Sequence, residues 1–112
     1  MQVFVHHLYE YKKGLRNLIL HTTKRQNEAR IVAKLESDGI RYLIQSVGSD
    51  KINVFFGADN CVDVVGNFIH KSLSDLTHEE DFILGIMLGY DRLKQCERYL
   101  LRKSKEPTLK VI

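Results

Sequence analysis

IRYLIQSVGSDKINVFF, residues 40–56, is the stretch that decides the fold of this chain. It contains two runs rich in β-forming residues, 40–47 and 52–56, on either side of the turn-forming segment Gly48-Ser-Asp50. Because a connection this short joins neighbouring antiparallel strands, the stretch predicts a β-hairpin. The second run is apolar on both faces except at Asn53, which predicts that it lies at the centre of the sheet.

A third strand and a helix are predicted upstream of this hairpin. Residues 18–22 form a short apolar run suited to a buried strand, and residues 24–38 follow as a helix that stops at Gly39. Thr23 is a candidate cap for that helix, with Gln26 three residues later. Since a helical crossover joins the first strand to the second, these two strands are expected to run parallel. The predicted sheet therefore has the strand order 1-3-2, with antiparallel neighbours.

Further helices are predicted on both sides of the strands. Apolar residues recur at helical spacing through residues 1–14 and again through residues 62–69. The clearest helix start in the chain is Thr77, which has a glutamate three residues later in the pattern of a capping box. It predicts one long last helix from His78 to about Lys103. The element order is α-β-α-β-β-α-α, an α+β fold in which about four to five helices pack on a three-stranded antiparallel sheet.

Length and composition are those of one small domain. The chain has 112 residues, of which 44% are hydrophobic and 28% charged, values that argue against disorder. We expect a single domain over residues 1–104 and a loose C-terminal tail over residues 105–112. No apolar run approaches the roughly 20 residues of a membrane span, and the N-terminus lacks the pattern of a signal peptide. Two cysteines without CxxC spacing suit a reducing compartment, so a cytoplasmic location is expected.

Charge is distributed unevenly along the chain, although the net charge is only +3. Residues 57–91 carry one base and seven acids, whereas residues 92–112 carry seven bases and two acids. Segregation of this kind favours complementary pairing over a uniformly basic nucleic-acid surface. The basic segment Arg98–Lys110 has no helix-turn-helix, RNP or zinc-finger spacing beside it. The sequence therefore does not favour a nucleic-acid partner.

Three blocks of sequence together carry a resemblance to a known family. They are HHLYEYKKGLR at residues 6–16, KINVFFG at residues 51–57 and LTHEEDFILGIMLGYDRLKQC at residues 76–96. The chain resembles a family of small uncharacterised bacterial proteins that is classed as a domain of unknown function, and the resemblance covers nearly all of it. The resemblance implies a three-stranded sheet wrapped by helices and a homodimer. It implies no activity.

The predicted last helix is a candidate surface for self-association. It is apolar nearly all round between Phe82 and Tyr90, so it should be covered on more than one side. Gly85 and Gly89 are four residues apart and would allow a second helix to approach closely. Two antiparallel copies would also bring the acidic start of one helix to the basic end of the other. The alternative is that the helix is buried by its own sheet. The expected dimer interface comprises Phe82, Gly85, Ile86, Gly89, Tyr90 and Leu93.

Candidate ligand-binding residues lie in the first helix and shortly after it: His6, His7, Glu10, Lys13, Arg16 and His21. His6 and Glu10 are one helical turn apart and could bind a divalent metal ion with a third ligand such as His21. Lys13, Arg16 and His21 could instead form an anion pocket, since a guanidinium suits carboxylate or phosphate. The alternative to both is a polar helix face joined by a His–Glu contact. No metal-binding signature is present, so neither a metal nor a cofactor is expected.

Cys61 is a candidate reactive thiol. It directly follows Gly57-Ala-Asp-Asn60, in the expected first turn of a helix, where the helix dipole favours a thiolate. Asp59 and Asp63 in the same turn oppose this effect, and the alternative is an ordinary packing residue.

Two classes of function are favoured at this point, ahead of a third, a nucleic-acid binder that would use the basic segment. The first is a cytoplasmic homodimeric accessory protein that acts by protein–protein interaction. The sequence contains no catalytic signature that would argue against it. The second is a small enzyme or a protein that binds an anionic ligand through the face of His6, His7, Glu10, Arg16 and His21.

Overall fold

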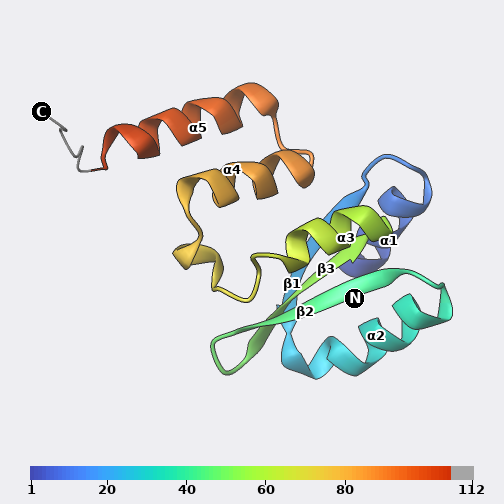
Figure 1. Ribbon diagram of the computed structural model, residues 1–112. Helices are drawn as coiled ribbons and strands as arrows, with labels where there is room; N and C mark the ends of the chain where they lie inside the picture. Colours follow the sequence, from blue (N-terminus) through green and yellow to red (C-terminus); the bar gives the residue numbers. More distant parts are fainter. Residues whose placement is uncertain (107–112) are drawn as a thin grey trace, which may run out of the picture.

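The computed structural model describes residues 1–106, and most of the predicted tail lies outside these residues (Figure 1). None of the helices within residues 1–106 is both long and apolar enough to cross a bilayer. The elements are α1 (Gln2–Lys12), β1 (Leu18–Lys24), the 3-10 turn η1 (Arg25–Asn27), α2 (Glu28–Ser37), β2 (Arg41–Val47), β3 (Lys51–Gly57), α3 (Asp59–Gly66), the 3-10 turn η2 (Leu73–Asp75), α4 (His78–Met87) and α5 (Arg92–Ser104).

The three strands form one sheet in the order β1-β3-β2. Both outer strands run antiparallel to β3, so β1 and β2 are parallel to each other, and the predicted topology is confirmed. β3 occupies the centre because residues on both of its faces are buried, from Ile52 through Gly57. The predicted α+β architecture is likewise confirmed, with five α-helices around this sheet in the described part of the chain.

Helices cover both faces of the sheet (Figure 1). α1 and α2 lie over the face that carries Val54 and Phe56, and together they enclose one apolar core. α3, η2 and α4 lie over the other face, where Phe55 is fully buried. This division follows from the strand geometry, because successive side chains of β3 point to opposite faces.

A row of polar side chains crosses the sheet and explains the one polar residue of the central strand. Thr22 Oγ1 donates to Asn53 Oδ1 at 2.6 Å, and Asn53 Nδ2 donates to Gln45 Oε1 at 2.9 Å. Gln45 Nε2 then donates to the carbonyls of Ile69 and Lys71 at 2.8 and 2.6 Å. Asn53 is therefore satisfied although it is buried. The row holds the segment after α3 against the sheet.

The predicted single last helix is wrong, because the segment forms two helices, α4 and α5, joined by a tight turn. Gly89 has φ +81°, a left-handed conformation that ends α4. Tyr90 N donates to Gly85 O at 3.2 Å, which closes the turn, and the Asp91 side chain accepts from Lys94 N at 2.9 Å to start α5. Gly89 therefore serves as a helix stop, and not as a position of close packing between helices.

The two predicted helix caps have different outcomes. The capping box at Thr77 is confirmed: Glu80 N donates to Thr77 Oγ1 at 3.1 Å, and Thr77 N donates to Glu80 Oε1 at 2.9 Å. The cap predicted at Thr23 is wrong, because β1 continues through this residue to Lys24. Thr23 instead accepts a hydrogen bond from Asn27 Nδ2 at 2.9 Å.

Candidate functional site

α4 and α5 form an antiparallel helical hairpin that projects from the sheet (Figure 1) and is joined internally by ion pairs. Arg98 donates to both carboxylate oxygens of Asp81, from Nε at 2.9 Å and from Nη2 at 3.1 Å. Arg102 Nη1 lies 3.0 Å from the same carboxylate. At the open end of the hairpin, Tyr99 OH donates to Glu79 Oε2 at 2.7 Å, and Lys103 Nζ lies 3.2 Å from the same oxygen.

These contacts use the charge segregation of the sequence within one chain. The acidic start of α4 meets the basic half of α5 of the same chain, and the pairing with a second copy that the sequence led us to expect stays a prediction. The hydrogen bonds and charge of Arg98 lower the pKa of Asp81. The Tyr99 hydroxyl, followed by Lys103, lowers the pKa of Glu79. The contacts of the hairpin are therefore strongest at a pH at which both carboxylates are ionised.

The glycines of α4 also have roles inside the chain. Gly85 is buried, and a Cβ at this position would clash with the side-chain amide of Gln95. The close helix approach that the sequence predicts at Gly85 therefore exists, but the approaching helix is α5 of the same chain. Gly89 is exposed, and a Cβ there would meet nothing within 4 Å, so its conformation is its only structural requirement.

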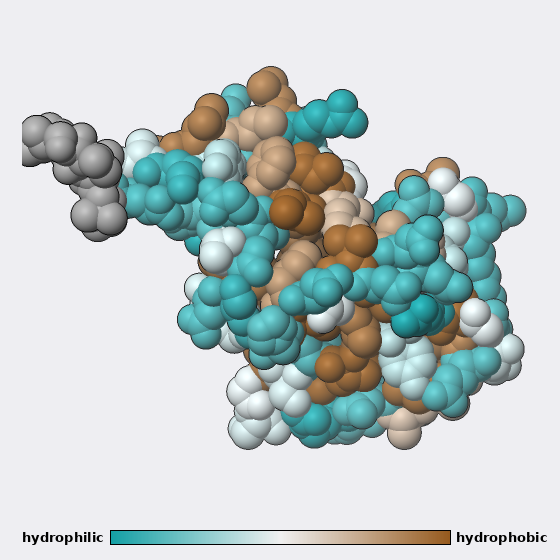
Figure 2. All heavy atoms as spheres, in the orientation of Figure 1, coloured by the Kyte–Doolittle hydropathy of each residue, from teal (hydrophilic) through white to brown (hydrophobic). Residues whose placement is uncertain are grey.

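The side of the hairpin away from the sheet exposes apolar side chains. Leu93 is 69% exposed and Leu100 65% exposed, and α5 has no buried residue. Figure 2 shows apolar residues gathered over the hairpin and toward the region between it and the sheet. An apolar groove of about 450 Å³, here called the outer groove, is lined by Glu79, Phe82, Ile83, Cys96, Tyr99 and Leu100.

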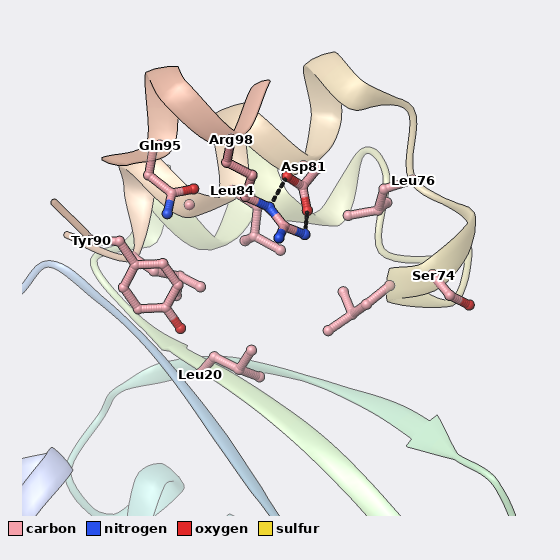
Figure 3. A pocket seen from close by; sticks show the side chains of 11 residues that line it. Leu20, Ser74, Leu76, Asp81, Leu84, Tyr90, Gln95 and Arg98 are labelled. Carbon is pink, nitrogen blue, oxygen red and sulfur yellow. Dashed lines mark hydrogen bonds and ion pairs between the residues drawn. The ribbon is translucent and has the colours of Figure 1, made fainter. Parts of the chain in front are cut away.

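A second hollow, here called the inner hollow, lies between the hairpin and the sheet (Figure 3). Its volume is about 460 Å³. Leucines from β1, from the η2 segment and from α4 form its walls, and the Arg98–Asp81 pair closes one side. The lining residues are Leu20, Leu73, Ser74, Leu76, Asp81, Leu84, Gly85, Leu88, Tyr90, Gln95 and Arg98.

The predicted histidine face brings two imidazoles together between α1 and β1. His7 Nδ1 and His21 Nδ1 are 3.2 Å apart, and the His21 ring also packs against Phe4 with 5.6 Å between ring centroids. Burial lowers the pKa of His21, and the neighbouring His7 lowers it further. Burial, followed by the charge of Arg16, lowers the pKa of His7. Both imidazoles are therefore set up as a neutral pair, in which one ring donates and the other accepts.

The remaining predicted residues are engaged nearby. Glu10 Oε1 lies 3.7 Å from His6 Nε2 and 3.8 Å from Arg16 Nη1. Arg16 Nη2 donates to the carbonyl of Leu88 at 3.1 Å, at the C-terminal end of α4, where the helix dipole favours a cation. Lys13 Nζ lies over the Tyr9 ring, 5.6 Å from its centroid.

These contacts change how the polar face is interpreted. Within residues 1–106, no three His, Cys, Asp or Glu side chains gather closely enough to hold a metal ion, so the metal site considered for His6, Glu10 and His21 is not formed. Arg16 joins the first loop to α4 and thereby ties the hairpin to the rest of the molecule. Its use by an anionic ligand stays a prediction.

Residues 2–102 match the family described as "Protein of unknown function (DUF2023)". The chain belongs to this family. No curated protein matches the sequence. The resemblance stated from the three sequence blocks is thus confirmed as far as the family and its unknown function are concerned.

In this DUF2023 chain, the sequence singled out Cys61 but did not predict the outer groove. Cys61 is half-buried in the first turn of α3 and packs against the core that contains Phe55, a placement typical of a packing residue. The outer groove was not predicted, because its residues come from two helices whose folding back was missed. The spacing of Leu93, Cys96 and Leu100, which puts all three on one side of a helix, is the signal that marks it.

Proposed function

We propose that this DUF2023 protein is a homodimeric accessory protein of the bacterial cytoplasm that acts by protein–protein interaction, and that its two copies associate through the α4–α5 hairpin. The observation that carries the proposal is the exposure of Leu93 and Leu100, 69% and 65%, on a helix with no buried residue. Isolated short helices are marginally stable in water, and most helices are stabilised by packing of an apolar face. α5 has such a face, and its own chain leaves that face exposed.

The apolar stripe of α5, made of Leu93, Cys96 and Leu100, lies beside, and not within, the contacts that join α5 to α4. α5 meets α4 through Gln95, Arg98, Tyr99 and Arg102. With about 3.6 residues per turn, Leu93 and Leu100 lie on the side of α5 away from these contacts, and Cys96 and Leu100 form part of the α5 wall of the outer groove. The stripe of one copy can fill the outer groove of the other, and the reverse contact then forms by symmetry. Such a self-complementary contact is the commonest dimer geometry, and here it would build a four-helix assembly.

The stripe also specifies a register for this contact. Leu93 lies three residues before Cys96, and Leu100 lies four residues after it. When two copies of α5 cross antiparallel, Leu93 of each meets Leu100 of the other, and the two Cys96 thiols lie near the two-fold axis. Full burial of a leucine contributes about 1.5–3 kcal/mol. The Arg98–Asp81 pair lines the inner hollow and is not covered by this contact, whereas Glu79, which pairs with Tyr99 and Lys103, lines the outer groove and loses part of its hydration.

The oligomeric state tests this proposal. Light scattering at micromolar concentration should give the mass of two chains. The double substitution Leu93→Ser and Leu100→Ser should give one chain with an unchanged circular dichroism spectrum. Leu101→Ser is the matched control: Leu101 is 59% exposed but lies off the stripe, so this variant should remain a dimer. A wild-type mass of one chain would overturn the proposal.

A crosslinking experiment tests the register. In a Cys61→Ser background, mild oxidation should join two chains through Cys96, because the antiparallel crossing brings these thiols together. Cys96→Ser in the same background should abolish the crosslink and leave the mass in solution unchanged. A dimer that never crosslinks through Cys96 would contradict the antiparallel α5 crossing.

A further inference from the structure

We propose that the inner hollow is a binding site for a small aliphatic carboxylic acid, whose chain packs among the leucines and whose carboxylate meets the polar side formed by Arg98. This site is separate from the outer groove and does not depend on the dimer. Nothing in the family description assigns a ligand.

The walls suit an apolar chain. Leu20 comes from β1, Leu73 and Leu76 from the segment before α4, and Leu84 and Leu88 from α4, so the apolar lining draws on three separate parts of the chain. A volume of about 460 Å³ falls within the range of ligand pockets, about 300–1,000 Å³. Pockets of this type combine an apolar lining with a few converging polar groups. The leucines meet the first half of that description.

Three polar side chains meet the second half. Figure 3 shows Gln95, Tyr90 and Arg98 around the same hollow, from α5 and the turn that precedes it. Arg98 uses Nε and Nη2 on Asp81. Among residues 1–106, no hydrogen bond is formed by Arg98 Nη1, by the Gln95 side chain or by the Tyr90 hydroxyl. Three side chains with donor groups are thus available to one ligand.

The charge around these donors favours an anion. Asp81 pairs with both Arg98 and Arg102, so one negative charge faces two positive charges. Within the lining itself the charges of Arg98 and Asp81 balance, and Arg102 adds a positive charge on Asp81 from outside the lining. A guanidinium is also the side chain best suited to bind a carboxylate, through charge-assisted hydrogen bonds. Ser74, the other polar side chain of the lining, already pairs with Ser72 at 2.9 Å.

The proposal is tested by titrating the full chain with sodium octanoate, below the concentration at which octanoate forms micelles, and following leucine methyl signals by NMR. The signals of Leu20, Leu84 and Leu88 should shift in a saturable way. Octan-1-ol, which has the same chain without the charge, should bind about tenfold more weakly. Equal binding of the alcohol would overturn the role of the carboxylate, and absence of saturable shifts would overturn the site.

Variants locate the ligand. Leu20→Trp fills the hollow from the sheet side and should abolish octanoate binding, and Leu73→Trp should do the same from the η2 side, so one of them suffices if the other does not fold. Arg98→Gln should weaken octanoate binding about tenfold. Leu100→Ser, in the outer groove, is the matched control and should bind octanoate as the wild type does. Loss of binding in Leu100→Ser but not in Leu20→Trp would place octanoate in the outer groove and overturn the proposal.

Discussion

The sheet with α1, α2 and α3 and the α4–α5 hairpin are stabilised in opposite ways. In the sheet region, Phe4, Ile31 and Phe55 are at most 1% exposed, and apolar burial dominates. In the hairpin, α5 buries no residue and is joined to α4 largely by ion pairs and by the contact of Phe82 with Tyr99. Exposed ion pairs contribute little to stability, about 0–1 kcal/mol each. The hairpin is therefore the less stable region, and it is also the one that leaves apolar side chains exposed.

Both polar and apolar contacts set the position of the hairpin relative to the sheet. Arg16 donates to the Leu88 carbonyl, and Lys71 Nζ lies 2.6 Å from Glu80 Oε1. Leu76, Leu84 and Leu88 continue the apolar core from the sheet into α4, but the inner hollow interrupts it. One side of α4 thus belongs to the core, whereas α5 depends on α4 and on whatever covers its outer stripe.

The largest difference between the two regions is expected for core truncation. Phe55→Ala should lower the free energy of unfolding by about 3–5 kcal/mol, because it removes a fully buried ring from the sheet. Leu101→Ala, in the exposed part of α5, should change it by less than about 0.5 kcal/mol. Urea unfolding followed by circular dichroism measures both values. Similar losses for the two variants would show that the hairpin is as tightly packed as the sheet.

An intermediate effect is expected at the turn between α4 and α5. Gly89→Ala should cost about 1–2 kcal/mol, since φ +81° is unfavourable for a residue with a Cβ. Gly66→Ala is the control, because Gly66 has no positive φ and an added Cβ would make only a contact of 3.4 Å with Leu43. Amide hydrogen exchange should become faster in α5 for the Gly89 variant and remain unchanged in β3. Faster exchange throughout the sheet would mean that the two regions unfold together.

The smallest effect is expected for the pH dependence of the stability of the sheet region. Burial lowers the pKa values of His7 and His21 below the ordinary value of 6.5, so the folded chain binds fewer protons than the unfolded chain as the pH falls through this value. Stability is therefore fully present above about pH 6.5 and decreases below it. His21→Phe, which keeps an aromatic ring against Phe4, should show a smaller drop in melting temperature between pH 7.5 and pH 5.5.

The control for this pH effect lies in the hairpin. Asp81 and Glu79 have lowered pKa values, so their contribution is present above the ordinary carboxyl range of about 4 and is lost below it. Melting curves above pH 5.5 should therefore not reflect them. An unchanged pH dependence in His21→Phe would show that the imidazole pair has no role in acid sensitivity.

Much of the fold could be predicted because its signals are local. The apolar residues on both faces of β3 placed this strand at the centre, and the short turn before it defined its antiparallel neighbour. The capping box at Thr77 likewise depends on two residues one turn apart. Alternation, turn length and capping are properties of neighbouring residues, so the sequence alone determined the strand order and the start of α4.

The arrangement of the last quarter of the chain depends on tertiary contacts. A glycine at position 89 is compatible with a continuous helix and with a turn. Asp81 can likewise pair with an arginine of its own chain or of another chain. The folding back of α5 settled both questions, and it also created the inner hollow and the outer groove. Charges and concave surfaces depend on which segments meet in space, and that information is shared among residues far apart in the sequence.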